Sequence, residues 1–140
     1  MSTIRETIMA AVVTALGGIT GCPVERSRVA AISRAQTPFL VVRLIDEADQ
    51  QFSDTDTRHD LTIALELFVR GEIPDQIADP YIQSAHAKLM ADPTLGGKCH
   101  WIISDGTKWE MDDADHASAM ITLSYKIIYT SIFTDLTRAY

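Results

Sequence analysis

The segment 119–130 places an apolar residue at every second position, and this alternation constrains the fold more than any other feature of the chain. Its odd positions carry Ala, Ile, Leu, Tyr, Ile and Tyr, whereas its even positions are mostly polar. Successive side chains of a strand point to opposite sides of a sheet, so this pattern predicts a strand with one buried face. The segment 61–70 alternates in the same way. The two segments predict a sheet that packs one face against other elements.

A third strand is expected from Phe39 to Ile45, after Thr37-Pro38. This run is almost continuously apolar and rich in β-branched residues, which is typical of a central strand covered on both faces. Residues 19–37, interrupted by Pro23, fit either a short extended stretch or a helix. The middle of the chain thus adds one clear strand and one ambiguous segment.

Two short strands are expected at about 100–103 and from Lys108 onward. Asp105-Gly106 lies between them, and Asp-Gly between two short apolar runs indicates a type I′ hairpin turn.

Two helices complete the set of elements. Thr3 and Glu6 have the spacing of a capping box, the apolar residues from Ile4 to Leu16 recur at helical spacing, and Gly17-Gly18 ends that helix. A second helix runs to about Met90. It begins either at Asp75, as a cap, or at Asp79-Pro80, with proline in the first turn.

Two helices and four or five strands in this order predict an α+β fold. We expect a two-layer domain over residues 1–140, in which one mainly antiparallel four- or five-stranded sheet packs both helices on one face. Met120 and Ile128, on the nominally polar side of their strand, hint that a partner covers the second face. The first residues lack the pattern of a signal peptide, and no run approaches the ~20 apolar residues of a membrane-spanning helix.

The chain is acidic, with a formal net charge of −7. Nucleic-acid binding depends on clusters of Lys and Arg, and the sequence contains no such cluster, which argues against a nucleic-acid-binding module. Cys22 and Cys99 lie far apart and are expected to be free thiols.

The segment 46–60 reads DEADQQFSDTDTRHD, with Phe52 as its only large apolar residue. We expect a long polar loop between two strands, which either orders on contact with a partner or stays solvated.

The motifs that suggest catalysis are incomplete. Gly96-Gly97-Lys98-Cys99 lacks the hydroxyl residue and the strand-to-helix context of a phosphate-binding loop. The acidic run 112–116 lacks the spacing of a calcium loop and is expected to be a solvated turn. His59 and His86 have no neighbouring ligand residues in sequence, and Cys99-His100 suits zinc poorly. We therefore expect no enzyme activity, no cofactor and no metal.

Several landmarks occur together along almost the whole chain. They are Val24–Arg28 after the first helix, the Thr37-Pro38 strand entry with its acidic sequel, Leu61–Gly71, Ala91–Gly97, Trp109-Glu110 before Ala114-Asp115, Leu123–Tyr129 and Thr134–Thr137. In their order and spacing they resemble the phage tail terminator family, of the minor tail protein U type. The chain departs from the family at Thr130-Ser131, where an arginine is expected after the tyrosine.

The resemblance implies a non-enzymatic virion protein that forms a homohexameric ring on the completed tail tube. Such a ring stops polymerisation of the major tail tube protein and offers a surface to the head–tail connector, while DNA passes through without specific binding. Assembly takes place in the host cytoplasm and the product is part of the virion tail. Contacts with the next subunit or the tube are expected from Arg26, Arg28, Asp46, Glu47, Asp49, Phe52, Asp54 and Asp56.

Two other interpretations remain open at this point. One is a head–tail connector or a contractile-tail completion protein, which shares the small size and ring assembly. The other, from a different class, is a small bacterial ligand-binding or hydrolytic α+β domain.

Overall fold

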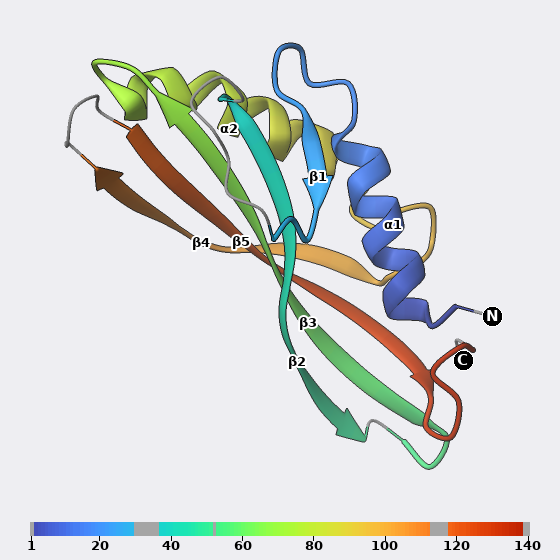
Figure 1. Ribbon diagram of the computed structural model, residues 1–140. Helices are drawn as coiled ribbons and strands as arrows, with labels where there is room; N and C mark the ends of the chain where they lie inside the picture. The colour runs from blue at the N-terminus through green and yellow to red at the C-terminus, as the bar shows by residue number, and fades with distance from the viewer. Residues whose placement is uncertain (1, 30–36, 52, 113–117, 139–140) are drawn as a thin grey trace.

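The computed structural model describes residues 2–29, 37–51, 53–112 and 118–138, which form two helices and five strands (Figure 1). The elements, in chain order, are α1 Ile4–Leu16, β1 Val24–Arg26, β2 Phe39–Gln51, β3 Asp56–Arg70, α2 Pro74–Met90, β4 Trp101–Asp112 and β5 Ser118–Ile132. Within the described ranges, no helix is both long and apolar enough to cross a bilayer.

The five strands form one sheet in the order β1-β2-β3-β5-β4. Only β1 and β2 pair in parallel, and the other three pairs are antiparallel. Residues 19–37, ambiguous in sequence, contribute the short strand β1; residues 30–36 lie outside the described part. The α+β prediction with a mainly antiparallel five-stranded sheet is confirmed.

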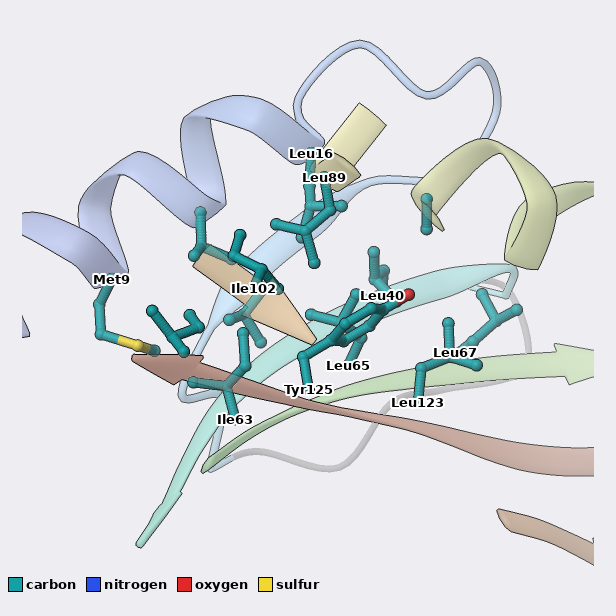
Figure 2. Packing of buried hydrophobic residues seen from close by; sticks show 14 of the residues in the cluster. Met9, Leu16, Leu40, Ile63, Leu65, Leu67, Leu89, Ile102, Leu123 and Tyr125 are labelled. Carbon is teal, nitrogen blue, oxygen red and sulfur yellow. The ribbon is translucent and has the colours of Figure 1, made fainter. Parts of the chain in front are cut away.

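The core lies between the helices and one face of the sheet. Buried side chains of α1 and α2, such as Met9, Leu16 and Leu89, meet the odd-numbered residues of β3 and β5, such as Leu65 and Leu123 (Figure 2). These are the residues that the alternation assigns to one face. Burial of large apolar side chains, each worth about 1.5–3 kcal/mol, holds the two layers together.

Helix α1 begins as the capping residues predict, but only half of the capping box forms. The Thr3 hydroxyl accepts a hydrogen bond from the Glu6 amide at 3.1 Å. The Glu6 carboxylate instead accepts two bonds from Arg26, at 2.7 and 2.8 Å. At the other end, Gly18 has a φ of 87°, the left-handed conformation expected after the last turn.

Helix α2 begins earlier than either sequence-based alternative. Pro74 occupies the first turn, which a residue without an N–H fits well. Asp75 is therefore an acidic first-turn residue rather than the cap, and the cap position, Ile73, makes no side-chain bond. Pro80 lies inside the helix rather than at its start.

The prediction of a long loop over 46–60 is wrong. Asp46 pairs with Thr62 and Gln51 with Thr57, so β2 and β3 form a long antiparallel hairpin. This hairpin arm, residues 44–51 and 53–62, continues past the layer of helices (Figure 1). The arm extends beyond the core, so most of its side chains face water and its strands need no alternation of apolar residues. Because this alternation is absent, the sequence did not reveal the strands.

Strand β4 also differs from the prediction. Asp105-Gly106 is not a hairpin turn: β4 runs unbroken from Trp101 to Asp112, and a bulge occurs between Ser104 and Thr107. Both halves of β4 pair with β5. A bulge inserts an extra residue into one strand, and Gly106, with a φ of 103°, supplies a conformation that other residues adopt at a cost.

The start of β2 is covered on both faces, as predicted, but its middle is not. Leu40 and Val42 join the core on the helix side, and Val41 is fully buried on the opposite side. Leu44 and Ile45 are 42% and 52% exposed. The apolar run therefore leaves the core before it ends.

Candidate functional site

Both arginines expected at an interface form ion pairs within the chain. Arg26 makes a two-pronged pair with Glu6, and this bond holds the pKa of the Glu6 carboxyl below its usual range. Arg28 pairs with Glu25 at 2.9 Å and lies over the Phe39 ring, 5.1 Å from its centre. Both side chains thus have partners in the isolated chain.

The acidic residues of the hairpin arm have different environments. Asp46 and Asp54 are exposed, whereas Asp56 is buried and accepts a bond from the Thr55 hydroxyl at 3.3 Å. Glu47 and Asp49 take part in a polar cluster described next. Phe52 lies outside the described residues.

The polar cluster gathers side chains from four elements on the helix side of the hairpin arm. His59 pairs with Tyr129 in the sheet register, and Asp49 pairs with His59. Because alternate residues share a face, the neighbouring odd positions complete the group. The His59 cluster consists of Arg5, Glu47, Asp49, His59, Tyr129 and Ser131.

His59 is the centre of this cluster. Its Nδ1 lies 2.6 Å from Asp49 Oδ1, and its Nε2 lies 2.7 Å from Ser131 Oγ. A carboxylate only accepts hydrogen bonds, so Nδ1 carries a proton and donates it to Asp49, and Nε2 is bonded to the serine hydroxyl. His59 as a whole is 1% exposed and Ser131 is fully buried.

Glu47 links the imidazole to α1 and β5. Its Oε2 accepts a hydrogen bond from Arg5 Nη1 at 2.9 Å and lies 3.5 Å from His59 Nδ1. Its Oε1 accepts from the Tyr129 hydroxyl. Burial is the main cause that raises the pKa of Tyr129 far above its usual range, and this bond to Glu47 is the second cause. The Tyr129 ring stacks on the imidazole with their centres 4.5 Å apart.

The order Ser131–His59–Asp49 resembles the hydrogen-bond array of a serine hydrolase, in which histidine activates the serine and a carboxylate orients the histidine. The nucleophile of such an enzyme must reach its substrate. Ser131 is 0% exposed, so the chain itself covers the hydroxyl. In this arrangement the array holds β2, β3 and β5 together rather than presenting a nucleophile.

Comparison of the chain with known proteins identifies no family. The chain matches no protein-family model, and no curated protein sequence is significantly similar to it.

The other candidates have structural explanations. Cys99 is buried and donates to the Pro93 carbonyl at 3.4 Å, and burial raises its pKa to about 11, which is unsuited to a nucleophile. The 92–97 segment is a turn whose Asp92 carboxylate accepts from the Thr94 hydroxyl and the Gly96 amide. These bonds, led by the one from Thr94, lower the pKa of Asp92.

His86 and the acidic run 112–116 are the remaining candidate sites from the sequence analysis. His86 Nδ1 lies 2.8 Å from the Tyr125 hydroxyl, so this histidine has a partner in the core layer. Residues 113–116 of the acidic run lie outside the described part of the chain.

Sequence reasoning missed the His59 cluster because its members are far apart along the chain. The signal that could have found it is register: once Asp49 is paired with His59 and His59 with Tyr129, all three side chains must share a face. The register of β2 and β3 depends on where the hairpin turns. The polar segment 46–60 contains no sequence signal that marks the position of that turn.

Proposed function

We propose that this protein is a tail terminator: a non-enzymatic subunit that closes into a homohexameric ring on the tail tube and ends its growth. The landmark residues of the sequence support the family, and the α+β sheet supports a fold of the expected kind. One observation carries the assembly step, namely that each end of the sheet has a strand edge that no described strand covers, at least in part.

The first free edge is β4. It pairs with β5 on one side, and on the other no described strand pairs with it. Trp101 and Ile103 are 46% and 47% exposed along this strand. Exposed apolar residues on an unpaired strand are a liability in a monomer, and a permanent partner removes it.

The second free edge is the outer side of β2 from Arg43 onward. The short strand β1 covers only residues 40–42 of β2, so from residue 43 onward no described strand pairs with that side. Leu44 and Ile45 are exposed there. Both free edges therefore carry large apolar side chains with no cover.

The two edges suit a head-to-tail contact. Three antiparallel pairings separate β2 from β4, so the two strands run in opposite directions. When β4 of one subunit meets β2 of the next in the same orientation, the new pair is antiparallel. A contact between two different surfaces closes into a ring when the rotation between subunits allows it.

Charge supports passage of DNA without retention. Each subunit carries −7, so a ring of six carries −42. A pore lined by part of this charge repels duplex phosphates, because binding to DNA requires cations that replace its counterions.

The alternatives differ in their support. A head–tail connector or completion protein would also assemble into a ring. Only a terminator is expected to stop polymerisation of the major tail tube protein. A hydrolytic domain is favoured only by the Ser131–His59–Asp49 array, and the burial of Ser131 opposes it.

The test is polymerisation of the major tail tube protein, followed by light scattering, with and without this protein. A terminator lowers the final scattering at substoichiometric amounts, because each ring blocks one tube end. Unchanged scattering at equimolar amounts contradicts the proposal and favours a connector or another class.

A further inference from the structure

Three side chains able to bind a metal ion converge on the helix side of the hairpin arm. One ligand atom from each of Glu47, Asp49 and His59 lies within 4.8 Å of the other two. His59 Nδ1 is 2.6 Å from Asp49 Oδ1 and 3.5 Å from Glu47 Oε2. Two carboxylate oxygens thus point at one ring nitrogen, which carries a single proton.

The surrounding residues hold these groups in place. The second ring nitrogen of His59 is bonded to Ser131, and the ring is stacked on Tyr129. The second oxygen of Glu47 accepts a hydrogen bond from the Tyr129 hydroxyl. In metal sites, the ligating histidine and carboxylate are oriented in this way through the atoms that do not touch the metal.

The cluster is buried on one side and open on the other. The side chains of His59 and Glu47 are 2% and 11% exposed, but that of Asp49 is 55% exposed. An ion can therefore enter past Asp49 and keep water molecules as its remaining ligands. Arg5 competes with it, because its guanidinium already occupies Glu47 Oε2 at 2.9 Å.

We propose that Glu47, Asp49 and His59 form a binding site for a divalent transition-metal ion of the zinc type. One imidazole nitrogen and two carboxylate oxygens suit such an ion, whose tetrahedral ligand distances of about 2.0–2.2 Å place neighbouring ligand atoms about 3.3–3.6 Å apart. The Nδ1–Glu47 distance already fits, and the Nδ1–Asp49 hydrogen bond opens by less than about 1 Å. The Nδ1 proton leaves, the ion takes the Nδ1 lone pair, and the neutral imidazole then carries its one proton on Nε2, which donates it to the Ser131 hydroxyl.

The sequence analysis expected no metal because the three residues do not form a ligand motif along the chain. They converge only through the pairing of Asp49 with His59. The site joins β2 to β3 in the arm that extends past the helices, so the bound ion stiffens that arm. This inference is independent of the proposed capping function, since it requires neither a ring nor a tube.

The experiment is calorimetric titration of the full chain with ZnCl₂ in a chelator-free buffer. The proposal predicts one ion per chain and a rise of the unfolding temperature with zinc, since a ligand of the folded state stabilises it. Asp49→Asn removes a ligand and weakens binding about tenfold or more. The matched control is Asp46→Asn, which makes the same charge change on the same strand but pairs with Thr62, away from the cluster, and keeps the affinity within about twofold.

A further variant tests the competing arginine. Arg5→Gln frees Glu47 Oε2 and removes a positive charge, so zinc binds more tightly than to the wild type. Absence of zinc binding by the wild-type chain overturns the proposal. So does equal binding by the Asp49→Asn and Asp46→Asn variants, which places the ion elsewhere, or an Arg5→Gln affinity that does not rise.

Discussion

His59 lies in the central strand with both ring nitrogens bonded, and this one side chain organises the polar interior of the hairpin arm. Sequence reasoning treated it as an isolated histidine, because its partners lie 10 and 72 positions away. Within the described part of the chain, no buried side-chain nitrogen or oxygen lacks a partner. A buried network of this kind is stable only while every member keeps its bonds.

Removing the hydroxyl of Ser131 tests the network. In Ser131→Ala, Nε2 of His59 loses its partner at a site that water does not reach, so the free energy of unfolding falls by about 1–3 kcal/mol. Urea unfolding followed by fluorescence measures this. Ser124→Ala is the control, since it lies on the same strand opposite Ala64, away from the cluster. Equal stabilities of the two variants would show that the bond contributes nothing.

The two cysteines give a second prediction at this scale. Burial raises the pKa of Cys22 and of Cys99 to about 11. At pH 8 only about one thiol in a thousand is then the reactive thiolate, so both resist an aromatic disulfide reagent in the folded chain. Two thiols per chain should react in denaturant. Rapid reaction of either cysteine in native buffer would contradict this prediction.

At the scale of elements, what the sequence predicted depended on burial. Strands β3 and β5 were predicted because their inner residues alternate against a core, and α1 was predicted from its caps and period. The arm at 46–60 was mistaken for a loop, since its strands lie largely outside the core and carry few apolar side chains. Asp105-Gly106 fitted a turn, but a bulge needs the same glycine conformation. Composition alone does not separate the two.

The free edge of β4 should matter for assembly and not for folding. Ile103→Glu places a charge on this edge, opposite Lys126 of β5, and a charged edge opposes pairing with another strand. Because Ile103 is 47% exposed, the free energy of unfolding changes by less than about 0.5 kcal/mol. Ring formation, measured by native mass spectrometry, should be lost. Ile73→Glu, at a similarly exposed apolar residue before α2, should still form rings; loss of rings in both variants would remove the special role of β4.

At the scale of the whole molecule, we propose that function depends on two surface properties: the free sheet edges for ring assembly and the negative charge for passage of DNA. The sequence indicated the class of the fold and the acidic character. It could not indicate the two free edges, because strand order depends on pairings between distant segments. Arg26 and Arg28, expected to bind the next subunit, already have partners in their own chain.

The charge leads to a prediction about DNA. The assembled ring should show no measurable affinity for a short duplex at physiological salt, because its formal charge is strongly negative and phosphate binding requires basic clusters. Fluorescence anisotropy of a labelled duplex checks this, with a basic DNA-binding protein as the positive control. Micromolar binding that weakens steeply with salt would mean that the pore holds DNA.

Site-specific cross-linking of the two edges tests the head-to-tail ring most directly. Ile103→Cys on β4 and Gln50→Cys on β2 are made singly and together, and treated with a short bis-maleimide while the native thiols stay buried. A head-to-tail ring gives covalent species up to the hexamer from the double variant, and only monomer from each single variant. Covalent dimers from a single variant would mean that like edges meet in a two-fold contact, and the ring would be excluded.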